Sequence, residues 1–416
     1  METTHFSEGI VMEILARLPL RSTARFKSVR KAWKSTLESA YFRRLFVSLH
    51  NNSSSSWSLL SLSGSEEYIG FHGCETWDLQ KSLASCIPPS FQRIPPFHFY
   101  KFNHEAFSNG LVLIEEQSNK ACYVGNPVLQ QWVEIPPPPD SSRLFGFVTR
   151  VDEDGVVLSF KVVRLYQVRL SNDYVSHSLS VSLYSSDTGM WTSKLRHCPC
   201  QITNISFMTL NGTIYFYYLS QAGAFAAHDF YSESDQFRVV YYSDHSSDNN
   251  PEFIRSLTTS RGFVMYIRTL AQEEETVFKV WKLNNDDSWQ LLWNLGLPSI
   301  GTNVPMAMHP FDSCIVYLWS LQNRHLVTCN LRARNYIILG ENDEHQDCVI
   351  DQPSCEKYMD DIWGSKTSHW DYGVSIRVFI QFVFPRWMES VPRPPQVEMI
   401  DTTALLSYIT SMQKEE

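Results

Sequence analysis

The sequence predicts an α+β multidomain protein, in which a small helical head is followed by a large all-β body and a short C-terminal helix. Apolar side chains recur at helical spacing through the first 48 residues, and this spacing ends at the polar segment His50–Ser56. Beyond that segment, short aromatic and β-branched runs alternate with turn residues, which is typical of many antiparallel strands. A length of 416 residues has room for both parts.

Three short helices are expected in the head. Ser7 begins the first and Pro19 ends it, with one apolar stripe formed by Ile10, Val11, Ile14, Leu15 and Leu18. Ser22 is expected to cap a second helix that carries Phe26, Val29 and Trp33, and a third covers residues 41–46. So few residues cannot bury this apolar surface among themselves. The head therefore docks either on the rest of the chain or on a partner.

The order of residues in the head resembles an F-box. The likeness is carried by Glu13–Ser22, which includes Leu18-Pro19-Leu20, by Arg25–Val29, by Lys31-Ala32-Trp33 and by Phe42. Phe6-Ser7 and Thr23-Ala24 depart from the family's usual Leu-Pro and Leu pair. The resemblance implies binding to the Skp-type adaptor of a cullin–RING ubiquitin ligase, with Phe26 and Val29 as candidates for internal packing instead. The implied adaptor-binding residues are Ile10, Ile14, Leu15, Leu18, Pro19, Leu20, Phe26, Val29 and Trp33.

A repeat of strand, polar turn and aromatic residue runs through the body. Six such aromatics follow one another at intervals of about 50 residues, the spacing of β-propeller blades. Six blades are the favoured number, with seven blades or an incomplete ring as alternatives. Each aromatic is expected to fill the space between neighbouring blades. The predicted blade-core aromatics are Trp77, Trp132, Trp191, Phe237, Trp289 and Tyr336.

The body is similar to the F-box-associated, kelch-like region of plant F-box proteins. Asn109-Gly110-Leu111, Asn126-Pro127 with Trp132, and Tyr184-Ser185-Ser186 with Trp191 carry this likeness. The expected division is a head at 1–48, a linker at 49–57, a propeller at 58–384, and a Pro-rich connector with a C-terminal helix at 385–416. Asp401 is expected to cap that helix, and its apolar face consists of Leu405, Leu406, Ile409 and Met412.

Charge and cysteine content narrow the function classes. Residues 1–50 hold nine Lys/Arg and four Asp/Glu, a formal charge of +5, whereas the remainder holds 26 and 40, a charge of −14. An acidic body argues against nucleic-acid binding, which requires basic residues to neutralise phosphates. No apolar run has the length of a membrane span or a signal peptide. Nine scattered cysteines fit the reducing cytoplasm and/or nucleus.

Catalytic and metal-binding motifs are weak throughout the sequence. His197-Cys198-Pro199-Cys200 is the best metal candidate, but zinc sites usually have a two-residue gap between cysteines and a second pair of ligands. Carboxylate groups such as Asp286-Asp287 lie among turn residues. No catalytic residue, cofactor or metal is therefore expected.

The sequence predicts a non-catalytic substrate receptor of a Skp–cullin–F-box ubiquitin ligase, whose propeller binds an unknown target protein. One alternative is a propeller that binds proteins outside any ligase. Another is an enzyme whose chemistry lies in the propeller's central channel.

Overall fold

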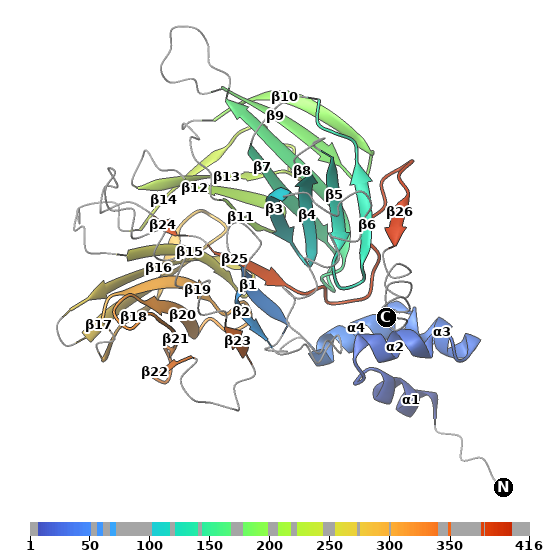
Figure 1. The fold of residues 1–416 in the computed structure, drawn as a ribbon, viewed down its shortest axis with the longest axis horizontal. Helices are drawn as coiled ribbons and strands as arrows, with labels where there is room; N and C mark the ends of the chain where they lie inside the picture. Colours follow the sequence, from blue (N-terminus) through green and yellow to red (C-terminus); the bar gives the residue numbers. More distant parts are fainter. Residues whose placement is uncertain are drawn as a thin grey trace, which may run out of the picture.

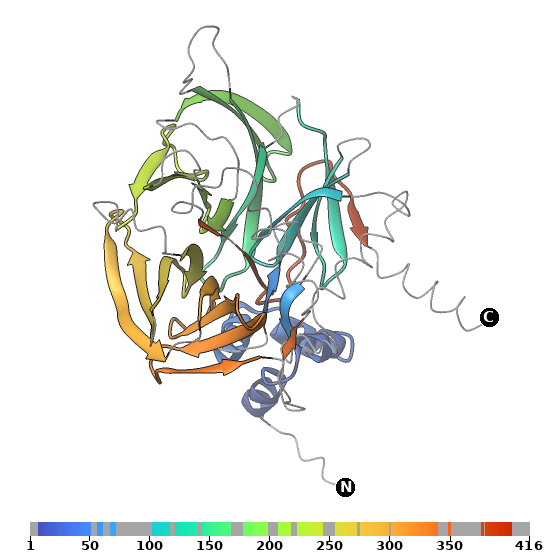
Figure 2. The same ribbon diagram turned by 60° about the vertical axis from the view of Figure 1, so that its left-hand side comes forward.

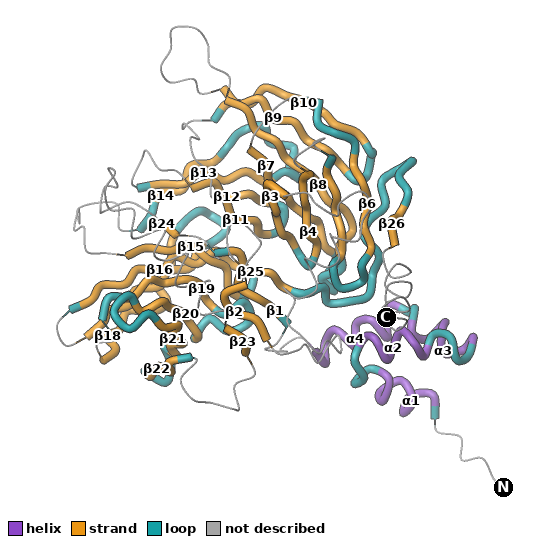
Figure 3. Tube along the Cα trace, viewed as in Figure 1, coloured by secondary structure: helices purple, strands orange, loops and turns teal. Residues whose placement is uncertain are grey.

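A computed structural model describes residues 7–50, 56–60, 67–71, 102–116, 121–139, 144–167, 178–198, 207–217, 223–243, 254–272, 275–298, 301–339, 348–350, 376–377 and 379–401. Trp77 and the apolar face expected for the C-terminal helix lie outside these residues. The helices lie together at the N-terminal end of the chain, on one side of a body made of strands (Figures 1 and 3). This arrangement confirms the predicted fold class.

Residues 7–50 form four helices where three are expected: α1 (Glu8–Leu15), α2 (Leu20–Phe26), α3 (Lys31–Leu37) and α4 (Ala40–His50). The predicted second helix is divided because Arg30 adopts an extended conformation, with φ −147° and ψ 140°, and caps α3. The cap of α2 is Pro19, not Ser22. Ser7 caps α1 as expected, since its side chain accepts a hydrogen bond from the Ile10 amide.

The body's described strands form six sheets, numbered I to VI here in chain order. Within each sheet the strands are named in spatial order, so that neighbours are hydrogen-bonded. Sheet I contains β23 (Cys348–Ile350), β2 (Glu67–Phe71), β1 (Trp57–Leu60) and β25 (Ile380–Val383). Sheet II contains β26 (Met399–Asp401), β6 (Gln131–Ile135), β5 (Cys122–Asn126), β4 (Leu111–Glu116) and β3 (Phe102–Ser108). Sheet III contains β10 (Met190–His197), β9 (Ser178–Ser185), β8 (Val157–Gln167) and β7 (Leu144–Val151).

The other three sheets follow the same antiparallel plan. Sheet IV contains β14 (Arg238–Tyr241), β13 (Ala224–Asp229), β12 (Thr213–Tyr217) and β11 (Phe207–Leu210). Sheet V contains β18 (Trp289–Pro298), β17 (Glu275–Leu283), β16 (Phe263–Ala271), β15 (Ile254–Ser260) and β24 (Ile376–Arg377), the last parallel to β15. Sheet VI contains β22 (Asn335–Ile338), β21 (His325–Asn330), β20 (Ile315–Ser320) and β19 (Asn303–Met308).

The six sheets are arranged around a common axis (Figure 2). Each of the six apolar clusters of the body combines side chains of two neighbouring sheets, so that every described sheet is packed on both faces. A four-stranded sheet exposes two apolar faces and is stable only when both are covered. This packing is that of a β-propeller. Six blades for the whole chain stays a prediction, because several segments lie outside the description.

Strands from both ends of the body close the ring. In sheet I, β1 pairs with β25, so that Trp57 lies opposite Val383 and Leu60 opposite Ile380. On β25, Gln381 links two further sheets. Its Oε1 atom accepts hydrogen bonds from the amide and hydroxyl of Thr259 in sheet V, at 3.0 and 2.6 Å, and its Nε2 atom donates to the Met308 carbonyl in sheet VI at 2.5 Å.

Inner strands of neighbouring sheets lie against one another around the axis. β15 contacts β19, β7 contacts β3 and β11, and β25 contacts β3. Side chains add cross-links at the end of these strands: Asn109 Nδ2 donates to Thr149 Oγ1 at 2.7 Å, and Ser260 Oγ donates to the His309 carbonyl at 2.7 Å. In the described part of the chain, contacts between strands and between side chains therefore join these sheets at the centre of the ring.

After β25 the chain crosses the propeller and returns to sheet II. Residues 384–397, called the strap here, lie against glycines in turns of sheets II and III. A Cβ atom on Gly110 would lie 2.5 Å from Pro385, and one on Gly155 would lie 2.9 Å from Arg386. Both glycines have positive φ, at 78° and 79°, so glycine meets a conformational as well as a steric requirement.

The strap ends at β26, where Ile400 lies opposite Trp132 in β6. The C-terminal connector is predicted as a segment of its own, and its described residues include β26, which pairs with β6 of sheet II. Asp401, the expected helix cap, is the last residue of β26. In the chain, α4 ends at His50 and β1 begins at Trp57. The division at residues 48, 57 and 384 into separate domains stays a prediction.

Candidate functional site

The outer side of α1 has two exposed apolar side chains one helical turn apart. Ile10 is 50 % and Ile14 is 51 % exposed, which is unusual for isoleucine, and their spacing of four residues puts them on one side of the helix. Glu13 and Arg17 flank them with an ion pair of 2.5 Å between exposed groups. This surface has an apolar centre and a charged edge.

Leu15 and Leu20 lie inside the head. They are 4 % and 0 % exposed and belong to one apolar cluster with Leu37, Phe42 and Phe46. In this arrangement neither leucine offers surface to a partner, although both were among the expected adaptor-binding residues. Leu18 packs partly against the same cluster.

Thr23 takes a buried place beneath α1. It is 0 % exposed, and its hydroxyl lies 3.2 Å from the Pro19 carbonyl and 3.4 Å from the Leu15 carbonyl, both hydrogen-bond acceptors. A buried hydroxyl with such partners avoids most of the desolvation penalty. The departure Thr23-Ala24 from the usual Leu pair is thus accommodated, with Ala24 exposed.

A second exposed part of the head lies between α2 and α3. Val29 is 58 % exposed in the turn that separates these helices. The half-buried rings of Phe26 and Trp33 meet edge to face, with centroids 5.6 Å apart. Pro19 is also half-buried. Of the nine expected adaptor-binding residues, three are exposed (Ile10, Ile14, Val29), four are half-buried (Leu18, Pro19, Phe26, Trp33) and two are buried (Leu15, Leu20).

The opposite side of the head, on α4, docks on the propeller. Phe42 and Phe46 are both 0 % exposed, and their ring centroids lie 6.0 and 5.2 Å from that of Trp387 in the strap. Arg43 forms ion pairs of 2.9 Å with Asp152 and Asp154 in the turn between β7 and β8. The head thus docks on the chain through α4, while the side that carries Ile10 and Ile14 is exposed and docking on a partner stays a prediction.

Sequence reasoning missed Trp387, Arg43 and the two aspartates. A usable signal was present, because a tryptophan in a Pro-rich connector is a large apolar side chain that requires a cover. The partners of Trp387 are more than 300 residues away in the chain, and no local pattern identifies them.

The repeat aromatics lie where sheets meet. Trp132 is 0 % exposed, and Trp191, Phe237, Trp289 and Tyr336 each belong to, or pack against, the cluster between their own sheet and the preceding one. Two of them make equivalent hydrogen bonds. Trp191 Nε1 donates to the Pro136 carbonyl, directly after β6, at 2.8 Å, and Trp289 Nε1 donates to the Tyr241 carbonyl in β14 at 2.7 Å, so each reaches the neighbouring sheet.

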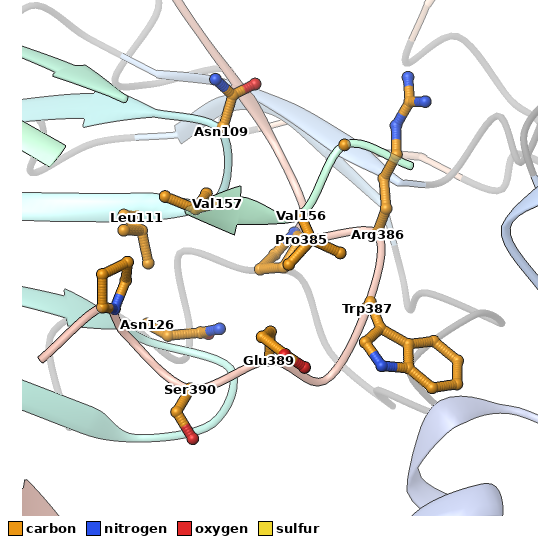
Figure 4. A pocket seen from close by; sticks show the side chains of 12 residues that line it. Asn109, Leu111, Asn126, Val156, Val157, Pro385, Arg386, Trp387, Glu389 and Ser390 are labelled. Carbon is orange, nitrogen blue, oxygen red and sulfur yellow. The ribbon is translucent and has the colours of Figure 1, made fainter. Parts of the chain in front are cut away.

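Two small cavities lie beside the strap in the described part of the chain. One of about 20 Å³ is lined by Asn109, Gly155, Trp387 and their neighbours (Figure 4), and a second of about 30 Å³ lies between Val47, His50 and Arg386. Either has room for about one water molecule. In Figure 4 the Trp387 indole points toward a helix of the head, and the Arg386 side chain points away from that helix. These hollows are packing gaps and not ligand sites.

The described residues hold no cluster of three or more His, Cys, Asp or Glu side chains arranged for a metal ion. Cys198 of the weak metal motif is buried, and Pro199 and Cys200 lie outside the description. Among the helices of the described chain, none is long and apolar enough to cross a membrane.

Comparisons with known proteins agree with both parts of the chain. The family model described as F-box protein At3g26010-like, beta-propeller matches residues 55–393. F-box protein At3g26010 of Arabidopsis thaliana is 58 % identical over 99 % of this chain and 96 % of its own length. At4g22430 of the same plant, named as an F-box/kelch-repeat protein, is 48 % identical over 99 % of this chain and 98 % of its own length. The chain therefore belongs to the plant F-box proteins with a β-propeller of the At3g26010-like family.

Proposed function

We propose that this protein is the substrate-recognition subunit of a Skp–cullin–F-box ubiquitin ligase, acting in the cytoplasm and/or nucleus. The head binds the Skp-type adaptor and, through it, the cullin–RING ligase, and the propeller binds a target protein. The observation that carries the proposal is the exposed pair Ile10 and Ile14, on the helix that resembles the start of an F-box, in a chain whose full-length relatives are named F-box proteins.

The proposed adaptor surface is formed by Ile10, Ile14 and Val29, with Leu18, Pro19, Phe26 and Trp33 at its edges. Exposed apolar side chains of this kind become the centre of an interface when a partner removes them from water. Leu15 and Leu20 support the surface from beneath, because they fill the core against which α1 and α2 pack.

The proposed role in ubiquitin transfer is positioning and not chemistry. The protein holds a target lysine near the charged conjugating enzyme, so that a bimolecular encounter becomes effectively intramolecular. In this proposal the chain provides no catalytic group, and bond formation belongs to other subunits.

Adaptor capture tests the proposal. Full-length protein carrying both Ile10→Asp and Ile14→Asp is expected to retain less than about a tenth of wild-type adaptor binding, because two carboxylates would be desolvated in the interface. The matched control is Leu195→Asp, on the propeller strand β10, where the wild-type leucine is 66 % exposed. Equal adaptor capture by all three proteins would contradict the proposed surface.

A second candidate is a propeller that binds proteins outside any ligase. The burial of Leu15 and Leu20 favours it, because this burial leaves fewer head residues for an adaptor. Failure of the wild-type chain to capture the adaptor, beside a consensus F-box that does so, would support this second function.

A further inference from the structure

We propose that the strap is a latch, with Trp387 as its positioning residue, that fixes the head on the propeller in one orientation. The head's placement is then determined by a segment at the far end of the chain and not only by the connection between α4 and β1. The strap is sandwiched between α4 and the propeller turns, and its central tryptophan contacts the helix.

The strap is held firmly on the propeller side. Pro385, Arg386 and Pro395 lie against the positive-φ glycines Gly110, Gly155 and Gly189, at 2.5, 2.9 and 3.1 Å from the position that a Cβ atom would occupy. Val391 is 1 % exposed in the cluster between sheets II and III. Pairing of β26 with β6 fixes the end of the strap. Contacts with sheets II and III therefore hold the strap in place independently of its contacts with the head.

On the head side, Trp387 of the strap packs against aromatic side chains of α4. Trp387 is 6 % exposed, and its ring meets Phe46 edge to face with centroids 5.2 Å apart. Phe46 stacks in turn on His50, whose Nε2 atom lies 3.0 Å from the Ala16 carbonyl next to α1. A continuous series of contacts thus leads from the strap through α4 to the helix that carries Ile10 and Ile14.

Charge fixes the rotation of α4 about this contact. Arg43 bonds both Asp152 and Asp154, and these three side chains are between 12 % and 24 % exposed. Asp152 is itself held rigid, since its Oδ1 atom accepts the Asp154 and Val156 amides at 2.9 Å. Ion pairs in partly buried, preorganised geometry are stronger and more directional than surface pairs.

The latch itself does not depend on the proposed function, but its importance for target delivery rests on it. A fixed head keeps the adaptor surface and the propeller at a constant separation, which raises the effective concentration of a bound target at the transfer site.

Hydrogen exchange of the full-length protein tests the latch. Trp387→Ala is expected to speed amide exchange in α4 by at least about tenfold, while exchange in sheets II and III stays within about twofold of wild type. The matched control is Tyr41→Ala, which removes a 66 % exposed ring from the same helix and is expected to leave exchange unchanged.

A charge exchange provides a second test that leaves the propeller core intact. Arg43→Asp is expected to speed α4 exchange, and Asp154→Arg in the same chain is expected to restore most of the protection. Unchanged α4 exchange in Trp387→Ala and Arg43→Asp would overturn the proposal. So would equally faster exchange throughout the strands of sheets II and III in Trp387→Ala, because Trp387 would then be a core residue of the propeller.

Adaptor capture separates the latch from the proposed function. Trp387→Ala is expected to bind the adaptor as wild type does, since Ile10 and Ile14 lie on another side of the head. A wild-type chain that fails to bind the adaptor contradicts the ligase proposal only, whereas the exchange results decide the latch.

Discussion

His309 lies in the turn between β19 and β20 and is 7 % exposed. Its Nδ1 atom accepts the amides of Phe311 and Asp312, at 3.2 and 3.1 Å, and therefore has to be unprotonated. Burial lowers the pKa of His309 from 6.5 to about 4, against a smaller opposing effect of Asp312. The imidazole thus has the same role in its turn as the Asn126 side chain has between β5 and β6, where it accepts the Val128 and Leu129 amides.

This lowered pKa predicts a loss of stability in mild acid. Below pH 6.5 the unfolded chain binds a proton at His309, whereas the folded chain does not bind one until about pH 4. The free energy of unfolding therefore decreases as the pH is lowered from 6.5 to about 4. Above pH 6.5 His309 adds no pH dependence. Between pH 7 and 5 the loss from this residue is about 2 kcal/mol.

The check is His309→Asn, which keeps an acceptor for the two amides and does not titrate. Urea unfolding at pH 7 and pH 5 is expected to show a smaller difference for the variant than for wild type, by about 2 kcal/mol. A lower stability of the variant at both pH values reflects lost ring packing against Trp57 and has no bearing on the test. Identical pH dependence of the two proteins would contradict the assignment.

The sequence predicted the features that local chemistry determines. The prediction of the Ser7 cap and of the repeat aromatics required only a short window of residues. The burial of Leu15 and Leu20 was not predictable, because helical periodicity marks an apolar side without telling which part of it faces the protein's own core.

Hairpin turns are the repeated element of this propeller. Asn109-Gly110, Asn211-Gly212 and Arg261-Gly262 each join the first two strands of a sheet, with two residues in the loop and positive φ at both. This is the type I′ turn, which suits the twist of a hairpin and favours Asn-Gly. Arg261, at φ 50°, is the exception among the three.

Arginine at position 261 of this turn type leads us to expect a stabilising substitution. Arg261→Asn is expected to raise the free energy of unfolding by about 0.5–1 kcal/mol, because asparagine tolerates the left-handed conformation better than arginine. The side chain is exposed and no atom lies within 4 Å of a Cβ at Gly262, so steric effects are small. The reverse substitution, Asn211→Arg, is expected to lower stability by a similar amount in the same urea titration. A shift in the same direction for both would contradict this account.

Elements were predicted well where one period continued without a break. The short aromatic and β-branched runs Leu111–Ile114, Val277–Leu283 and Ile315–Trp319 are parts of strands β4, β17 and β20. The helix expected from Ser22 to Trp33 is two helices, because the extended backbone at Arg30 interrupts an apolar spacing that by itself looks continuous.

The closure of the ring can be tested at Gln381. Gln381→Leu leaves the Thr259 and Met308 groups without their partner, which is expected to cost about 2–3 kcal/mol of the free energy of unfolding. Gln290→Leu is the matched control, since Gln290 is exposed on β18. Equal urea midpoints for the two variants would contradict a role of Gln381 in closure.

The sequence predicted a propeller but not how its ends meet. The pairing of β1 with β25, and the contact of Trp387 with Phe46, join residues that are far apart in the chain and have no local signature. Such contacts are specified by the assembled sheets and not by periodicity.

Sheet I also has a consequence for synthesis on the ribosome. β1 is translated early, but its partner in β25 emerges about 320 residues later, which at 5–20 residues per second is a delay of roughly 15 to 65 s. During this interval the backbone amides and carbonyls on the edge of β1 that later pairs with β25 have no native partner. We therefore expect nascent chains that stop before residue 380 to be held by chaperones, and their release to follow completion of the last blade.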